Sequence, residues 1–191
     1  MDLYEAIQNR RSHRFFKPDL PPKEVLDKVI NAGLWAPSGT NAQPWEITVL
    51  GGRFRDEFVA LAAHSITALL PILRSAQVSD ESRKLVVNFF RDLGGAPVVI
   101  AVTLYKVAEP HIMEAFIQSG AALMQNLLLA AHAEGLGTCW MTGPNYVATE
   151  LLDYLGKPDQ HLLGITPIGY SAKTPPVPPR KDREVRWLGF E

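Results

Sequence analysis

The sequence predicts a layered α/β protein, because segments typical of strands alternate with segments typical of helices. The clearest strand is the run 96–105, which is apolar and rich in β-branched residues, as expected of a strand buried on both faces. The chain has 191 residues and a hydrophobic content of 47%, enough for a sizeable core. We therefore expect a single domain over residues 1–191, and the order of its strands stays open.

The helices are predicted from apolar residues at helical spacing, and the strands from short apolar runs between Gly- or Pro-containing breaks. Pro22 suits the first turn of its helix, and Gly33 with Pro37 marks its end. The expected helices cover residues 3–8, 22–34, 54–73, 80–93, 114–134 and 147–155. The expected strands cover residues 45–50, 96–105, 136–142 and 162–170.

The longest expected helix, 114–134, is uncharged from Ala115 to Ala131 and is apolar around most of its circumference. Such a helix needs burial on nearly every side. A subunit interface would provide that burial, and so would a central position within one chain. The sequence favours neither arrangement.

A C-terminal arm is expected over residues 171–191. The run Pro175–Pro179 has almost no backbone donors and suits an extended polyproline conformation. Ten such residues span roughly 30 Å. The arm can therefore carry the basic residues between Arg180 and Arg186 back over the domain, or onto a neighbouring subunit.

The composition argues against several classes of protein. A net charge of -1 gives no general reason to expect nucleic acid or a membrane surface as a partner. Cys139 is the only cysteine, and neither a signal peptide nor an apolar span is recognisable, so we expect a cytoplasmic protein. The five histidines lack metal-ligand spacing, and nucleophile motifs are missing, so a bound cofactor is expected to supply the chemistry, with no metal and no catalytic side chain.

A cluster of cations follows the first helix, at Arg10, Arg11, Ser12 and Arg14. Guanidinium groups and a serine hydroxyl suit a phosphate, although a short basic run is also typical of a solvated helix C-terminus. Arg180 and Lys181 follow the stiff arm. We hypothesise that they converge on the same anion.

Amide and hydroxyl side chains are concentrated in the loop that precedes the strand at Trp45. Ser38, Asn41 and Gln43 offer donors and acceptors for a flat polar ring, and Pro37 begins the loop. The same residue types also form ordinary capped turns. Together with the cationic cluster, however, the loop indicates a ligand that has both a phosphate and a polar ring, namely flavin mononucleotide (FMN).

The segment 135–143 is the third candidate element. Its Gly135-Leu-Gly137 start suits a helix cap and lacks dinucleotide-binding spacing. The far end of the strand is where sites in α/β proteins commonly lie. The residues expected there beside a flavin ring are Trp140, Met141, Thr142 and Gly143.

These motifs together resemble the nitroreductase family of FMN-dependent oxidoreductases. The resemblance rests on the Arg-Arg-Ser-x-Arg-x-Phe motif at 10–16, the Ala-Pro-Ser-x-x-Asn-x-Gln-Pro-Trp motif at 36–45 and the helix sequence at 120–131. It implies an α+β fold, a three-layer α-β-α sandwich with a central mixed sheet, and a homodimer with exchanged C-terminal arms. The helix at 120–131 would then be dimer core.

The resemblance also implies roles for the candidate residues. Arg10, Arg11 and Ser12 would bind the FMN phosphate together with Arg180 or Lys181, and Arg14 would lie toward the pyrimidine end of the ring. The loop with Ser38, Asn41 and Gln43 would reach the ring from the partner subunit. Residues 140–143 would line it from the same subunit.

The implied activity is reduction of nitroaromatics, quinones or similar small acceptors by NAD(P)H, with ping-pong hydride transfer through flavin N5. Two alternatives stay open. One is a specialised chemistry of the same family, such as reductive dehalogenation, flavin fragmentation or dehydrogenation. The other is a non-enzymatic role for the sequence from Pro175 to Arg180, which has the form of a polyproline ligand.

Overall fold

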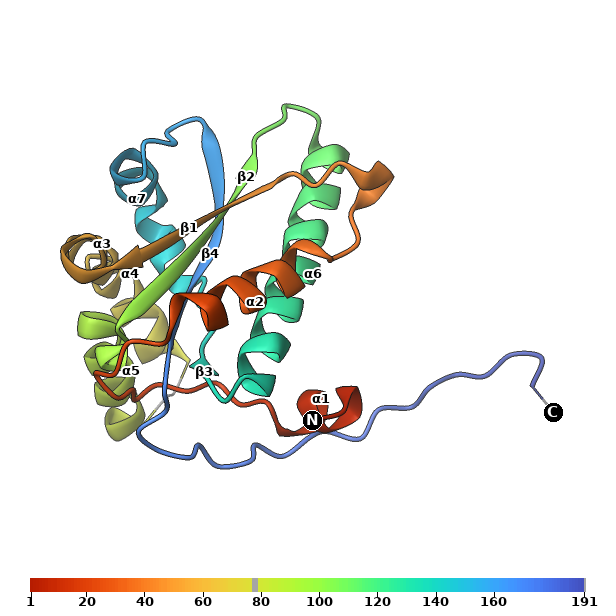
Figure 1. Cartoon of the computed structure of the whole chain (residues 1–191), viewed down its shortest axis with the longest axis horizontal. Helices are drawn as coiled ribbons and strands as arrows, with labels where there is room; N and C mark the ends of the chain where they lie inside the picture. Colours follow the sequence, from red (N-terminus) through yellow and green to blue (C-terminus); the bar gives the residue numbers. More distant parts are fainter. Residues whose placement is uncertain (77–78, 191) are drawn as a thin grey trace.

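The computed structural model of the chain describes residues 1–76 and 79–190, and the last residue of the expected arm, Glu191, lies outside them. The fold combines helices with one four-stranded sheet (Figure 1). The helices are α1 (Leu3–Asn9), α2 (Lys23–Leu34), α3 (Gly52–Ala63), α4 (Ser65–Ser75), α5 (Asp80–Asp92), α6 (Pro110–Ala133) and α7 (Ala148–Tyr154). The strands are β1 (Trp45–Gly51), β2 (Val98–Tyr105), β3 (Gly137–Thr138) and β4 (Gln160–Gly169).

The sheet has the order β1-β2-β4-β3, and its strand pairings are antiparallel throughout the described residues. The mixed character that the family resemblance predicts is limited to an isolated parallel bridge between Ser12 and Thr138. Strand β2 is buried along seven of its eight residues, as predicted from its apolar run. It is buried on both faces although the sheet is antiparallel, because helices cover both sides.

Two hydrophobic cores lie on opposite faces of the sheet and define three layers. Val99 and Ala101 of β2 belong to the core under α3, α5 and α7. The alternate residues Ile100 and Val102 belong to the core under α2 and α6. Figure 1 shows these two groups of helices on either side of the strands. The predicted three-layer α+β sandwich is therefore confirmed.

The sequence left open whether helix α6 is buried within the chain or at a subunit interface. One side is buried within the chain through residues such as Leu123, Leu127 and Ala131. On the rest of the helix Ile112 and Ile117 are 47% and 37% exposed. A central position within the chain accounts for the buried side, and the other side is available for a further contact.

Two predicted elements are wrong in extent. The single helix expected at 54–73 is divided at His64 into α3 and α4, where the Ser65 hydroxyl donates to the Ala62 carbonyl oxygen at 2.6 Å. The strand expected at 136–142 is reduced to β3. Met141 forms an isolated bridge with Ile165 in the same register as β3, which puts Cys139 opposite Pro167. Proline has no backbone N–H to donate, so the ladder is interrupted there.

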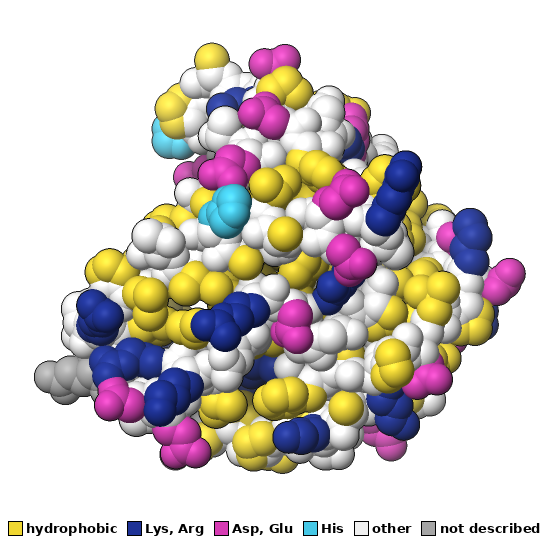
Figure 2. All heavy atoms as spheres, turned by 90° about the vertical axis from the view of Figure 1, so that its left-hand side faces the viewer, with side chains coloured by type: hydrophobic (Ala, Val, Ile, Leu, Met, Phe, Trp, Pro, Cys, Tyr) yellow, Lys and Arg dark blue, Asp and Glu magenta, His cyan; other side chains and the backbone are white. Residues whose placement is uncertain are grey.

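The outer face formed by α3, α4, α5 and α7 carries apolar side chains between cations and carboxylates (Figure 2). Phe54, Ile72 and Leu85 on these helices are 52%, 45% and 53% exposed. No single helix among the described residues has the length and apolar character to cross a membrane. The helices at 52–62 and 65–75 satisfy those two criteria only as a pair, and the pair is bent by 46°.

Candidate functional site

The structure brings the N-terminal cations and the C-terminal arm together around one cleft. This basic cleft has a volume of about 390 Å³. Arg10, Arg11, Ser12 and Arg14 form one side of it, and Arg180 lies on the other. The arm residues Pro175, Pro176 and Pro178 complete the wall. The hypothesis that both chain ends converge on one site therefore agrees with the placement of Arg180, whereas Lys181 does not line the cleft.

The backbone of residues 12–17 is held in place by pairing with three other segments. His13 N–H donates to the Thr138 carbonyl oxygen at 2.8 Å, and Phe16 N–H donates to that of Gly94 at 2.9 Å. Lys17 N–H donates to the carbonyl oxygen of Tyr170 at 2.8 Å. Ser12 and Arg14 thus belong to a segment fixed between β3, the turn after α5 and the end of β4, whereas Arg10 is the C-cap of α1.

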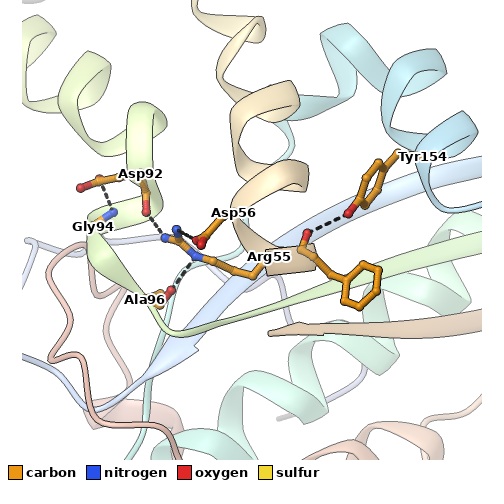
Figure 3. Close-up of polar contacts among 7 residues, drawn as sticks. Arg55, Asp56, Asp92, Gly94, Ala96 and Tyr154 are labelled. Atoms are coloured by element: carbon orange, nitrogen blue, oxygen red, sulfur yellow. Dashed lines mark hydrogen bonds and ion pairs between the residues drawn. The ribbon is translucent and has the colours of Figure 1, made fainter. Parts of the chain in front are cut away.

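Arg55 of α3 fixes the turn after α5 (Figure 3). Its Nε donates to the Ala96 carbonyl oxygen at 2.9 Å, and its Nη2 donates to that of Asp92. Between them Gly94, at φ +67°, lies so close to the chain that an added Cβ would meet the Arg14 carbonyl oxygen. Only glycine fits both this conformation and this space. The turn therefore packs directly against the backbone of Arg14.

The charges around the basic cleft are unbalanced. Burial, and after it the charges of Arg180 and Arg11, lower the pKa of the Arg10 guanidinium. Arg10 Nε is buried and has no hydrogen-bond partner among the residues that the structure describes. An uncompensated buried donor is costly, and an anion in the cleft would relieve the repulsion between the guanidinium groups.

A second pocket adjoins the basic cleft. This adjoining pocket has a volume of about 540 Å³ and shares Ser12, Arg14, Pro175 and Pro176 with the cleft. Its other walls come from α5, the Gly94–Gly95 turn and the arm. Arg14 lies 5.9 Å from the Phe89 ring centroid, so the guanidinium group contacts an aromatic face.

Asn88 is not among the site residues predicted from the sequence, yet it lines the adjoining pocket with Leu85 and Phe89 of α5. Leu85, Asn88 and Phe89 follow the helical i, i+3, i+4 spacing and therefore share one face. That spacing is visible in the sequence, but the surface that this face meets is decided only by the packing of α5 against the segment 12–16.

The amide loop at 37–43 lies elsewhere. Pro37, Asn41 and Gln43 line a separate pocket of about 560 Å³, which also includes Leu34 and Trp35. Figure 1 shows this loop beyond one end of α6, while the arm passes α1 at the other end. Within one chain, the structure therefore does not bring the loop to the basic cleft.

The amide loop is nevertheless held by hydrogen bonds within it. The Ser38 hydroxyl accepts from Gln43 N–H at 3.0 Å, and Gln43 Nε2 donates to Asn41 Oδ1 at 3.0 Å. Thr40, Asn41 and Gln43 have φ of 53°, 56° and 44°, a region that residues other than glycine rarely adopt. Strained conformations of this kind cluster at ligand-binding loops, although the hydrogen bonds also match the capped turn that the sequence left open.

Residues 140–143 line neither the basic cleft nor the adjoining pocket. Met141 is 5% exposed and pairs with Ile165, and Trp140 packs against the core under α2 and α6. A Cβ on Gly143 would lie 2.6 Å from Phe90 Cζ of α5, while Thr142 is exposed. A role beside a ring stays a prediction for these four residues. The helix cap expected at the start of the strand is present, with Gly135 at φ +78°.

Cys139 and the histidines do not form a separate centre. Burial raises the pKa of the Cys139 thiol, which agrees with an inert buried cysteine. Among residues 1–76 and 79–190, no three His, Cys, Asp or Glu side chains are placed to share a metal ion.

The model of the nitroreductase family, described as "Nitroreductase family", matches residues 7–170, and the chain belongs to this family. A Methanothermobacter thermautotrophicus protein with the provisional name NADH dehydrogenase/NAD(P)H nitroreductase is 31% identical, over 92% of this chain and 80% of its own length. The iodotyrosine deiodinase of Thermotoga neapolitana is 29% identical, with 98% of each chain covered.

A solved structure with a similar name is also similar to this chain in fold. Iodotyrosine deiodinase bound to FMN and 3-iodo-L-tyrosine has a TM-score of 0.77 and 26% identity, over 99% of this chain and 100% of that one. The similarity to this chain extends beyond the sheet and its helices to nearly the whole length.

Proposed function

We propose that this chain is an FMN-dependent oxidoreductase that uses NAD(P)H to reduce small organic acceptors such as nitroaromatics or quinones. The observation that carries the proposal is the convergence of Arg10, Arg11, Ser12 and Arg14 with Arg180 on one cleft beside a larger pocket. Guanidinium groups with a hydroxyl form a donor set for a phosphate monoester.

The residues present fit the flavin as well as its phosphate. The adjoining pocket has apolar and aromatic walls at Phe15, Leu85 and Phe89, with the Asn88 amide among them. Such walls with few polar groups are typical of cofactor sites. When bound, FMN supplies hydride transfer between NAD(P)H and the acceptor. Arg14, which borders both spaces, would place a positive charge beside the ring, where it favours the electron-rich form.

We further propose that the complete site needs two copies of the chain. The amide loop is exposed and held by hydrogen bonds within it, and it is remote from the basic cleft of its own chain. Trp35 beside it is 87% exposed, and Tyr4 of α1 is 74% exposed. A homodimer would cover such surfaces and bring Ser38, Asn41 and Gln43 to the partner's ring. Residues 1–191 would form one domain, with 171–191 as the arm.

The first test is the absorption spectrum of the purified protein, with the heat-released cofactor identified by chromatography. We expect flavin absorption and FMN. Steady-state kinetics with NADH or NADPH and a quinone should then give the parallel lines of a ping-pong reaction, because both substrates would use the same cleft in turn. A colourless protein that does not bind added FMN would contradict the proposal.

Reductive dehalogenation is the second candidate, because iodotyrosine deiodinase relatives match the chain over nearly its full length. Turnover of 3-iodo-L-tyrosine, measured as iodide release with the flavin pre-reduced, separates the two. Release of iodide faster than reduction of nitroaromatics or quinones would favour the deiodinase. A role as a polyproline ligand is less consistent with the structure, since Pro175, Pro176 and Pro178 face the chain's own cleft.

A further inference from the structure

The C-terminal arm begins at a hydrogen-bonded chain of three residues, one of which, Lys173, lines the adjoining pocket. The Ser171 hydroxyl oxygen lies 2.6 Å from His13 Nδ1 and 2.6 Å from the Lys173 carbonyl oxygen. A serine hydroxyl has one proton, and a carbonyl oxygen can only accept. Ser171 therefore donates to Lys173, and it accepts from the Nδ1–H of His13.

His13 is itself immobilised. Its backbone N–H donates to the Thr138 carbonyl oxygen at 2.8 Å. Its ring packs on Gly137, where an added Cβ would lie 2.8 Å from His13 Cγ. The direction of the Nδ1–H is thus set by β3 and by the segment that carries Arg10 to Arg14. The donor has a fixed position relative to one side of the basic cleft.

The backbone alone does not determine how the arm leaves β4. Phe16 pairs with Ser171, and Ala172 N–H donates to the Phe15 carbonyl oxygen at 2.9 Å, which places residues 171 and 172. The next peptide is oriented by the hydrogen bond from Ser171 to the Lys173 carbonyl oxygen. The Lys173 ammonium group then lies 4.4 Å from the Phe15 ring centroid.

Any change of direction at Lys173 is transmitted along the arm. Proline fixes φ near −65° and restricts the residue before it, so Thr174 to Pro179 has few ways to compensate. Pro175 and Pro176 line both the basic cleft and the adjoining pocket, and Arg180 lies at the end of this stiff segment. The position of the Arg180 guanidinium therefore depends on the start of the arm.

We propose that His13 and Ser171 are positioning residues for anion binding: through the Lys173 carbonyl they direct the arm so that Arg180 faces Arg10 across the basic cleft. This inference rests on the proposed function, because the anion meant is the phosphate of FMN. Neither residue needs to contact that phosphate. Their effect is exerted through Arg180.

The experiment is a double-mutant cycle on the full-length protein, with FMN and riboflavin as probes. Ser171→Ala removes the hydroxyl, Ser171→Thr keeps it, and Arg180→Ala removes the group that is positioned. Loss of one neutral hydrogen bond costs about 0.5–1.5 kcal/mol, so we expect Ser171→Ala to raise the FMN Kd by roughly 2- to 12-fold. Riboflavin, which lacks the phosphate, should lose less affinity than FMN, because the arm also borders the adjoining pocket.

The decisive result is the coupling between the two sites. If Ser171 acts through Arg180, Ser171→Ala has no further effect on the FMN Kd in the Arg180→Ala background, and Ser171→Thr retains wild-type affinity. Additive effects, or equal losses for FMN and riboflavin, would overturn the inference, because a merely structural serine would give either pattern. Thermal unfolding of each variant shows that the proteins compared are folded.

A second pair of variants tests the donor itself. Asn at position 13 carries an N–H close to the position of the imidazole Nδ1, whereas Gln carries it near Nε2. His13→Asn should therefore retain more FMN affinity than His13→Gln, and the reverse order would overturn the inference. Wild-type protein that binds neither flavin would refute the proposed function, and this inference with it. Wild-type FMN binding with an additive cycle would refute only the inference.

Discussion

The basic cleft and the amide loop carry the two halves of one predicted ligand site, and a single chain completes only the first. Arg10, at the end of α1, and Arg180, in the arm, are brought together. The loop with Asn41 and Gln43 is held in a strained, hydrogen-bonded conformation away from them. The difference shows that a single chain brings only the cationic residues together. In the proposed homodimer, the other copy would supply the loop.

Of all the changes considered, removal of the arm is expected to have the largest effect on FMN affinity. A chain ending at Ala172 loses Arg180 and the proline wall, and a charge-assisted hydrogen bond alone is worth about 1.5–3 kcal/mol. We expect FMN affinity to fall by about 100-fold or more, measured by fluorescence titration. A chain ending at Arg186 keeps the cleft and is the control. Equal FMN affinity of the two truncated chains would show that the arm does not form part of the site.

The second prediction tests whether the two halves come from different chains. Arg10→Ala and Gln43→Ala should each weaken FMN binding by about 10-fold, because each removes direct hydrogen bonds. In a mixed dimer of the two variants, one site carries both changes and the other carries neither. Co-refolding the variants should therefore restore wild-type affinity at a fraction of the sites.

The control for this experiment is co-refolding of Arg10→Ala with Arg180→Ala, two residues that belong to the same cleft. Each site of that mixed dimer carries one change, so wild-type affinity should not return. Two results would mean that the loop does not serve the partner's cleft. One is a return of wild-type FMN affinity in this control. The other is no return of it when Arg10→Ala is co-refolded with Gln43→Ala.

The third prediction concerns Gly94, in the turn that packs against the backbone of Arg14. Gly94→Ala forces a left-handed conformation on alanine and places its Cβ against the Arg14 carbonyl oxygen. Strain of this kind costs about 1–3 kcal/mol, and the steric conflict adds to it. The free energy of unfolding, measured in urea, should fall by more than in Gly52→Ala. Gly52 has φ +52° with open space around its Cβ position, so it measures the strain alone.

The smallest effect is expected from a change of pH, which alters the free energy of unfolding. Burial, and then the charge of His132, lower the pKa of His13, while burial and then Arg10 and Arg11 lower the pKa of His132. Below about pH 6.5 the unfolded chain therefore binds more protons at these sites than the folded one. The free energy of unfolding should decrease as the pH falls through that range.

His132→Gln should make this dependence shallower, as measured by urea unfolding at a series of pH values. His111→Gln, at an exposed position of α6, is the control. The amide loop contains no titratable side chain between Pro37 and Gln43, so Gln43→Ala should leave the pH dependence unchanged. A slope unaffected by His132→Gln would contradict the assignment.

Much of the local structure could be predicted from the sequence, and the failures have physical causes. Strand β2 and helix α6 were found because burial imposes an apolar pattern on strands and helices. The break at His64 was missed because it depends on a serine hydroxyl that competes for a backbone carbonyl, which no periodicity reports. Asn88 was missed because an amide on a helix signals nothing until its neighbours are known.

The sequence by itself determined which chemical groups this protein carries, since guanidinium groups, amides and a stiff proline run are properties of the residues and their spacing. Only the tertiary structure decided which of them meet. It placed Arg180 opposite Arg10, and it left the loop at Asn41 and Gln43 apart from both. The physical reason is that contacts between distant segments depend on how helices and strands pack, and that packing is a property of the whole chain.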